Sequence, residues 1–334
     1  MKPDKHIRCA VIGYGGAYSM GKNHVGWINE TPGLKTVAVC DLDADRLAIA
    51  KQEFPEIKTY RGVGALLARA DFDLAVAVTP HNTHAAVALQ CIKAGKHVVL
   101  EKPMCITVKQ CTEVIQAAKR KGVVLSVFHN RRWDGDYQTI RDVIEKGVIG
   151  DVFHIVAHGG GWGHGGGWRR VKKISGGAFY DWGAHLVDWV LGLVPSKVES
   201  VTGFFHKLAF PEVTNEDQAR ALVRFRNGCI ADITITHLSR APKPRWRILG
   251  TKGSILDQGG GSFRLYTDIK GIPCESEVKY QATKWQSYYA ALADHLLSGK
   301  PLMVTPESAR RAIGVIEYAE RSSKNKRSLA VPYE

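Results

Sequence analysis

Short apolar runs alternate with helical patterns in the N-terminal part of the chain, and this alternation constrains the fold more than any other feature. The apolar runs are Arg8–Ile12, Thr36–Cys40, Leu74–Val78, His97–Leu100 and Val123–Val127, and the short segment Lys58–Tyr60 takes the place of a further strand in the alternation. Segments with helical spacing lie between them, over 44–53, 62–69, 83–94 and 108–121. Strands that alternate with helices in this way predict an α/β domain with a parallel sheet and right-handed crossovers.

Four glycines, Gly13, Gly15, Gly16 and Gly21, follow the first apolar run, and a helical pattern begins near Gly21. A strand, a glycine turn and a helix in this order are typical of a dinucleotide site. The glycines let the backbone approach a pyrophosphate, and the helix N-terminus attracts it. The pattern therefore predicts a Rossmann doubly wound sheet, although the loop is longer than that of the GxGxxG motif.

The second apolar run ends in Asp41, 20 residues after Gly21. A carboxylate at this position can accept hydrogen bonds from an adenosine ribose. Asp43 adds a second negative charge and no arginine immediately follows Asp41, so a 2′-phosphate would be repelled. We therefore expect NAD in preference to NADP. The alternative is that Asp41 is an ordinary helix N-cap or turn acid.

Polar residues follow the other strands of the expected sheet, at the carboxyl ends where parallel sheets bind ligands. Lys102 stands out because it follows an apolar run and precedes a proline; the alternative is a lysine in a surface ion pair. The residues expected to contact the cofactor are Gly13, Gly15, Gly16, Gly21, Asp41, Thr79, Pro80, His81, Asn82, Glu101, Lys102, Asn130 and Arg131. Whether a cis peptide bond lies within Glu101–Pro103 cannot be decided from sequence.

The pattern changes from about Asp151, where strands replace the alternation. The expected strands are Val152–His158, Val198–Phe205, Gln218–Phe225, Cys229–Thr236, Arg245–Leu249 and Phe263–Tyr266. Arg226–Gly228 is expected to be a hairpin turn. These strands predict an α+β domain with a large, mostly antiparallel open sheet. One face would pack on helices, and the other needs a cover, so we expect a homodimer or homotetramer through this sheet.

A polar stripe crosses an otherwise apolar segment, Gly176–Leu191. If the segment is helical after its glycine pair, Asp181, His185 and Asp188 share one face. Ionisable groups on a buried helix need partners or a function. The segment alone leaves open whether Asp181 and His185 form a structural pair or a reactive one.

A glycine-rich segment, Gly159–Trp168, precedes this helix. So many glycines predict a mobile loop, and its position suggests a lid. Trp162 and Trp168 could stack on the C–H faces of a sugar ring; the alternative is that both pack locally. A metal site built on His158 and His164 is disfavoured because no carboxylate or cysteine lies at zinc-like spacing, so no metal is expected.

Composition excludes several classes of protein. No apolar run approaches the ~20 residues that cross a membrane. Met1–Arg8 is polar, which argues against a signal peptide. Seven scattered cysteines favour free thiols in a reducing cytoplasm. The formal net charge is +14, but Lys and Arg are spread along the chain, which favours a solvated basic surface over a nucleic-acid partner.

Taken together, these motifs resemble those of the Gfo/Idh/MocA oxidoreductases. The matching elements are the Gly13–Gly21 loop, Asp41, Thr79-Pro80 with His84, Glu101-Lys102-Pro103, Asn130–Trp133, Gly176-Gly177 with Asp181, His185 and Asp188, and the segment Gly299–Glu307. The resemblance implies two domains, 1–128 for NAD and 129–334 for substrate and oligomerisation, with a helix at about 306–322 packing back on the first. It makes Lys102, Asp181 and His185 catalytic and adds His84 to the cofactor contacts.

The resemblance also implies hydride transfer between a nicotinamide and a secondary alcohol of a sugar, sugar derivative or cyclitol. His185 would take the hydroxyl proton, and Lys102 would favour negative charge on the oxygen. The residues expected at the substrate are Lys102, Arg132, Trp133, Trp162, Trp168, Asp181 and His185. Two alternatives remain open: glycoside cleavage through transient oxidation by bound NAD, and a non-catalytic sugar sensor.

Overall fold

The computed structural model describes residues 6–334, and the chain divides into two compact units. The first contains the residues up to Asn130 together with Gln286–Arg310, and the second contains Arg131–Trp285 with Arg311–Glu334. Residues 1–5, which carry most of the polar segment that argued against a signal peptide, lie outside the described part. Among residues 6–334, no helix is long and apolar enough to cross a bilayer.

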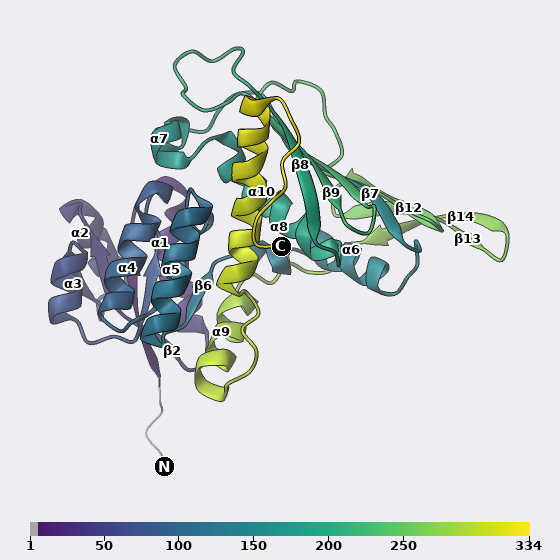
Figure 1. Ribbon diagram of the computed structural model, residues 1–334. Coiled ribbons are helices and arrows are strands. Elements are labelled where there is room, and N and C mark those ends of the chain that lie inside the picture. Colours follow the sequence, from purple (N-terminus) through teal and green to yellow (C-terminus); the bar gives the residue numbers. More distant parts are fainter. Residues whose placement is uncertain (1–5) are drawn as a thin grey trace. The chain divides into compact units, whose positions relative to one another are not determined.

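The first unit is built on a six-stranded parallel sheet, in the order β3-β2-β1-β4-β5-β6 (Figure 1). Its strands are β1 (Ile7–Ile12), β2 (Leu34–Asp41), β3 (Lys58–Arg61), β4 (Leu74–Ala77), β5 (His97–Leu100) and β6 (Leu125–Val127). The helices are α1 (Met20–Glu30), α2 (Ala44–Glu53), α3 (Val63–Arg69), α4 (His84–Lys93), α5 (Val108–Lys121) and α9 (Ser287–Ser298). The predicted Rossmann sheet is confirmed; its central strand β4 is fully buried, which is why it reads as a continuous apolar run.

Local signals in the sequence fix the bounds of α5, the helix that follows the turn Glu101-Lys102-Pro103, which we call the lysine turn. Thr107 Oγ1 accepts a hydrogen bond from Gln110 N, and Gln110 Oε1 accepts one from Thr107 N, each at 3.2 Å. This capping box satisfies two backbone donors that a helix start otherwise leaves unpaired. The helix ends at Gly122, whose φ of 68° is the left-handed conformation that glycine adopts without strain.

The second unit is built on an eight-stranded sheet, in the order β14-β13-β12-β11-β7-β10-β9-β8 (Figure 1). Its strands are β7 (Val152–Gly160), β8 (Val198–His206), β9 (Gln218–Phe225), β10 (Ile230–Thr236), β11 (Trp246–Gly250), β12 (Gly253–Gly259), β13 (Ser262–Ile269) and β14 (Ile272–Lys279). Only β7 and β10 pair in parallel, so the predicted mostly antiparallel sheet is confirmed. The helices include α6 (Gly135–Glu145), α7 (Lys172–Ser175), α8 (Trp182–Leu193) and most of α10 (Pro306–Asn325).

Helix α8 positions the candidate site of this unit because it packs on two neighbouring strands inside the sheet, β7 and β10. Ile155 and Ala157 of β7 and Ile233 of β10 are fully or almost fully buried. Ten of the twelve residues of α8 are buried, as its apolar composition predicts. The predicted turn between β9 and β10 is also present, since Gly228 has a φ of 87° and its N–H donates to Phe225 O.

All seven cysteines lie in the described part of the chain, and all are free. Six are buried, and Cys274 is partly exposed. Burial raises the pKa of the Cys9 thiol to about 12 and that of Cys40 to about 11. These thiols are therefore protonated and unreactive at neutral pH.

Candidate functional site

The glycine loop after β1 is shaped to approach a ligand closely. Gly13 has a φ of +104°, and a Cβ there would lie 2.3 Å from Val78 O. A Cβ on Gly21 would lie 2.5 Å from Gly13 O, so α1 can start this close to β1 only with glycine. A Cβ on Gly15 would meet no other atom within 4 Å. Helix α1 has no side-chain cap and no acidic residue in its first turn. An uncapped helix start beside open space suits a pyrophosphate.

The extra residues of the lengthened loop form a short 3-10 turn, Ala17–Ser19. Tyr18 and Ser19 have φ values of 61° and 49°, in the left-handed region. This conformation costs about 1–2 kcal/mol per non-glycine residue. Such backbone strain clusters at ligand-binding loops, and here it lies directly before α1.

The carboxylate of Asp41 closes the loop from the end of β2. Its Oδ2 accepts a hydrogen bond from Tyr14 N at 2.6 Å, and its Oδ1 accepts one from Asp43 N at 3.0 Å. The N-cap of α2 is Asp43, which accepts from Asp45 N at 2.9 Å. Asp43 and not Asp41 is therefore the helix N-cap, whereas the hydrogen bond from Asp43 N to Asp41 is the one that a turn acid accepts.

Arg46, which the sequence analysis did not single out, lies on the other side of this loop. A Cβ on Gly16 would be 2.5 Å from one of its guanidinium nitrogens. Its place three residues after the N-cap Asp43 is the only sequence signal for it. The loop therefore has both the negative charge of Asp41 and the positive charge of Arg46 within reach. The prediction of NAD over NADP rested on the negative charges alone.

The lysine turn follows β5. Glu101 is buried and its Oε2 accepts a hydrogen bond from Lys102 N at 2.9 Å, while Lys102 is half-buried. The Lys102–Pro103 peptide bond is cis. His84 is fully buried, and its ring nitrogens lie 2.9 Å from Thr79 O and from Pro103 O. The His84 side chain thus links the turn after β4 to the turn Glu101–Pro103.

The remaining rim residues of the first unit gather near the same strand ends. Thr83 Oγ1 donates to Pro80 O or Thr79 Oγ1, at 2.7 Å in each case, which fixes the turn after β4. His81 is buried, Asn82 is exposed, and Asn130 is buried after β6. The predicted cofactor residues up to Asn130 therefore lie on one rim of the parallel sheet.

At the start of α8, the structure corrects the expected polar stripe. Asp181 precedes the helix with φ −84° and ψ −91°, whereas His185 and Asp188 lie within it. The break arises because Phe179 packs against Gly183, where a Cβ would meet the phenyl ring at 2.2 Å. Asp181 therefore stands at the N-terminus of the helix, and His185 is buried in its first turn.

The third member of the stripe, Asp188, has a structural partner. Arg132 Nε donates to Asp188 Oδ2 at 2.8 Å, and Arg132 Nη2 donates to Asp188 Oδ1 at 2.6 Å. This two-point pair satisfies the buried carboxylate. It also occupies the guanidinium that the sequence analysis assigned to substrate.

Arginines and tryptophans surround Asp181 and the partly exposed ring of Trp182. The guanidinium carbons of Arg131 and Arg245 lie 4.4 and 5.6 Å from the Trp182 ring centre, and Arg169 Nε lies 3.6 Å from Asp181 Oδ2.

Two of these arginines also have carboxylate partners of their own. Arg131 forms an ion pair with Asp134, and Arg245 forms one with Asp136. Arg131, predicted at the cofactor, thus packs on Trp182 in the second unit, and Trp133 is half-buried beside it. Because the arginines have carboxylate partners, this region suits a neutral polar ligand better than a strongly anionic one.

Only the first part of the glycine-rich segment is paired with a neighbouring strand, and most of 161–166 has no regular secondary structure. Strand β7 continues to Gly160, and Gly161 N and Gly163 N donate to Thr236 O and His237 O. Trp162 is half exposed, with the Arg240 guanidinium 3.7 Å from its ring centre, and Trp168 lies 4.4 Å from the guanidinium of Arg169. Backbone pairing with residues 236–239 gives these glycines the partners that the sequence alone could not supply.

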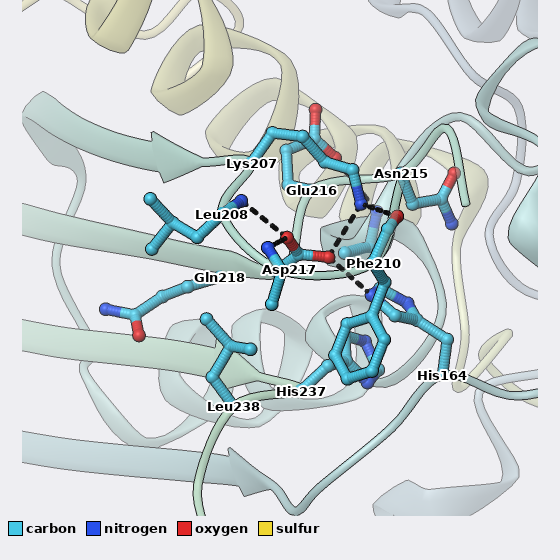
Figure 2. Close-up of polar contacts among 12 residues, drawn as sticks. His164, Lys207, Leu208, Phe210, Asn215, Glu216, Asp217, Gln218, His237 and Leu238 are labelled. Atoms are coloured by element: carbon cyan, nitrogen blue, oxygen red, sulfur yellow. Dashed lines mark hydrogen bonds and ion pairs between the residues drawn. The ribbon is translucent and has the colours of Figure 1, made fainter. Parts of the chain in front are cut away.

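A buried carboxylate, Asp217, anchors the middle of this segment (Figure 2). Its Oδ1 accepts from His164 Nε2 at 2.9 Å and from Lys207 Nζ at 2.8 Å. Its Oδ2 accepts from the backbone N–H of Leu208 and of Ala209, at 2.6 and 2.8 Å. The ring of His164 also stacks on that of His237, with centres 4.0 Å apart. Among the described residues, no group of three or more His, Cys, Asp or Glu side chains is placed to hold a metal ion.

Comparisons with known proteins agree with this arrangement. Residues 7–129 match the family described as "Oxidoreductase family, NAD-binding Rossmann fold", and residues 137–256 match "GFO/IDH/MocA C-terminal domain". The chain belongs to the Gfo/Idh/MocA family. The expected family, fold and NAD(P)-binding oxidoreductase class are therefore confirmed.

Individual Gfo/Idh/MocA relatives align over almost their whole length. The uncharacterized oxidoreductase YdgJ of Escherichia coli is 28% identical over 98% of this chain and 99% of its own. The scyllo-inositol 2-dehydrogenase (NADP(+)) IolW of Bacillus subtilis is 26% identical over 98% of this chain and 96% of its own. The crystal structure of an NAD-binding protein from Listeria innocua has a TM-score of 0.89 and 28% identity, covering 98% of this chain and 97% of that one.

Proposed function

We propose that the protein transfers a hydride between NAD and a secondary alcohol of a sugar, sugar derivative or cyclitol. The observation that carries the proposal is the start of α8, where Asp181 stands at the helix N-terminus and the His185 imidazole lies in the first turn beside Trp182. Aromatic faces and balanced charges favour a neutral polyol. A relative that is a scyllo-inositol dehydrogenase supports the same substrate class.

In oxidation, the alcohol carbon loses a hydride and its oxygen loses a proton, which leaves a ketone. A bound nicotinamide would supply the hydride acceptor. His185 takes the proton on a ring nitrogen, as an imidazole does near neutral pH. Lys102 holds the reacting oxygen and stabilises its negative charge. Asp181 binds a neighbouring hydroxyl and orients the substrate.

The test is to screen NAD reduction by the purified protein against inositols, monosaccharides, anhydrosugars and glycosides. Net formation of NADH with one compound class supports the proposal and identifies the substrate. Cleavage of a glycoside with no net NADH would favour transient oxidation instead. Saturable binding of a sugar without any turnover would favour a sensor.

We propose NAD over NADP because the Asp41 carboxylate is fixed at the end of β2 by Tyr14 N and Asp43 N. Asp41→Ala should weaken NAD binding by about 10- to 100-fold, the effect of losing hydrogen bonds to a charged group. The same variant should gain affinity for NADP, because Arg46 then faces the 2′-phosphate without an opposing carboxylate. Isothermal titration with both cofactors measures the change.

Asp43→Ala is the matched control for Asp41→Ala. It removes the N-cap of α2 and should cost about 1 kcal/mol of stability. Because Asp43 does not bond the glycine loop as Asp41 does, it should change the ratio of the two affinities less than Asp41→Ala. Wild-type protein that binds NADP more tightly than NAD would contradict the proposed preference.

We further propose that the outer face of the eight-stranded sheet joins copies of the chain. On this face Phe204 of β8 lies opposite Arg220, and Leu222 of β9 lies opposite Asp232 in the register of the strands. Phe204 is 42% exposed, and an open sheet face of this kind needs a cover. Light scattering should give the mass of a dimer or tetramer, and a monomer at micromolar concentration would contradict this.

Six buried free thiols favour a reducing cytoplasm as the compartment.

A further inference from the structure

Three side chains in the first unit form a buried chain that ends at the lysine turn. His24 Nδ1 lies 2.6 Å from Tyr289 Oη, and His24 Nε2 lies 3.0 Å from Glu101 Oε1. The other carboxylate oxygen of Glu101 accepts the N–H of Lys102 at 2.9 Å. His24 and Tyr289 have no exposed surface. The chain therefore links α1, which starts at the glycine loop, and α9 to Lys102.

The chemistry of the groups fixes the direction of the hydrogen bond between His24 and Glu101. An ionised carboxylate can only accept, so His24 Nε2 carries a hydrogen and donates to Glu101. The second ring nitrogen, Nδ1, shares a hydrogen with the Tyr289 hydroxyl, which can donate or accept. Burial raises the pKa of Tyr289 well above its usual value, which keeps the phenol protonated. Burial alone would raise the pKa of Glu101, but the hydrogen bond from His24 and the charge of Lys102 outweigh it and lower the pKa.

Aromatic packing holds the imidazole in place. The centre of the His24 ring lies 4.4 Å from that of Phe128 and 5.5 Å from that of Trp27, both in edge-on geometry. Because Phe128 and Trp27 pack against the imidazole, it cannot rotate without breaking its hydrogen bonds to Tyr289 and Glu101. His24 fixed in this way holds the Glu101 carboxylate, and a small shift of Glu101 is passed on to Lys102 through the hydrogen bond from Lys102 N.

We propose that Tyr289, His24 and Glu101 position Lys102 for reaction, with His24 as the central positioning residue. This rests on the proposed function only in giving Lys102 a role in turnover; the effect on Lys102 itself is measurable without substrate. The contacts predict that weakening any bond of the chain changes the environment of the Lys102 ammonium group. Binding of NAD at the glycine loop should be little affected.

The first experiment needs neither cofactor nor substrate. Acetic anhydride at limiting concentration labels lysines of the apo protein, and mass spectrometry reads the rate at Lys102 relative to Lys96, which precedes the same strand. His24→Leu should change the Lys102 rate by at least about threefold, the effect of half a pKa unit, with Lys96 unchanged. His24→Gln, which can still donate to Glu101 and accept from Tyr289, should restore the wild-type rate. An unchanged Lys102 rate in a folded His24→Leu variant would overturn the proposal.

The second experiment uses two adjacent tyrosines as a matched pair. Tyr288 is as buried as Tyr289, but its hydroxyl bonds Ser126 Oγ at 2.8 Å, outside the chain. Tyr289→Phe should lower kcat by about 10-fold at constant KM for NAD, whereas Tyr288→Phe should leave kcat within about twofold. Equal effects of both variants on kcat and on Lys102 labelling would contradict a positioning role. If no sugar is turned over, the proposed function fails, but the labelling rate of Lys102 still decides this inference. If His24→Leu does not fold, the labelling of Lys102 in Tyr289→Phe, compared with Tyr288→Phe, decides it.

Discussion

Lys102→Ala is expected to lower kcat by at least about 100-fold while the dissociation constant for NAD stays within about threefold of the wild-type value. The ammonium group acts on charge that develops during the reaction, so its loss affects turnover and not the ground-state binding of the cofactor. Steady-state kinetics on the substrate found by the screen, together with NAD titration, measure both quantities. His185→Ala should reduce kcat to a similar extent, because no other group is then assigned to take the proton.

Lys96→Ala is the control for Lys102→Ala, because the two lysines stand at opposite ends of β5. Lys96 Nζ donates to Phe72 O at 2.7 Å, so its removal tests stability without touching the lysine turn. Its kcat should match that of the wild type. Retention of turnover in both Lys102→Ala and His185→Ala would remove these residues from the mechanism.

Asp217→Asn is expected to destabilise the protein by about 3–5 kcal/mol, the usual effect of removing one member of a buried charged network. The carboxylate has no exposed surface, and asparagine removes its charge and places an NH2 group against two of its donors, either Lys207 and His164 or the N–H groups of Leu208 and Ala209 (Figure 2). Urea unfolding measures the change, and proteolysis within 159–168 should become faster because His164 no longer anchors the segment. The control is Glu212→Gln, which removes an exposed partner of Arg170 and should change stability by less than about 1 kcal/mol.

The same carboxylate contributes to the dependence of stability on pH. Burial would raise the pKa of Asp217, but the hydrogen bonds from Lys207, Ala209, Leu208 and His164 outweigh it and hold the pKa well below the usual value of 3.8. Its contribution is therefore fully present above the unfolded pKa and is lost as the pH falls below it. Wild-type stability should fall between about pH 5 and pH 2 more steeply than that of Asp217→Asn. Parallel curves would show that Asp217 is not held in this way.

The inner strands of the first unit, such as β4 and β5, could be predicted because they are buried and read as apolar runs. The edge strand β3 has no buried residue and could be predicted only from its place in the alternation of strands and helices. Strands β12 and β14 were missed for the opposite reason. In β14 most residues are exposed, including Pro273, Glu275 and Glu277, so neither an apolar run nor a clear alternation marks it. Their pairing depends on β13 as a partner, which is a tertiary contact that local sequence does not carry.

The places of Asp41 and Lys102 at strand ends and of His185 on a buried helix could be predicted from sequence; their roles are proposals. The place of Asp181 could not, because the helix starts late only when Phe179 packs on Gly183. Asp217, His24 and Tyr289 were also missed. Each acts through partners that are distant in sequence, and a single buried polar residue in an apolar pattern does not identify its partner.

The most direct test of the central claim is to follow one hydrogen atom. The purified protein is given NAD and the substrate deuterated at the carbon that bears the reacting hydroxyl, and the cofactor is analysed by mass spectrometry. We expect one deuterium in the NADH formed by the wild-type protein, and none above background with Lys102→Ala. Substrate consumption without deuterium in the cofactor, or equal transfer by the Lys102→Ala and His185→Ala variants, would contradict it.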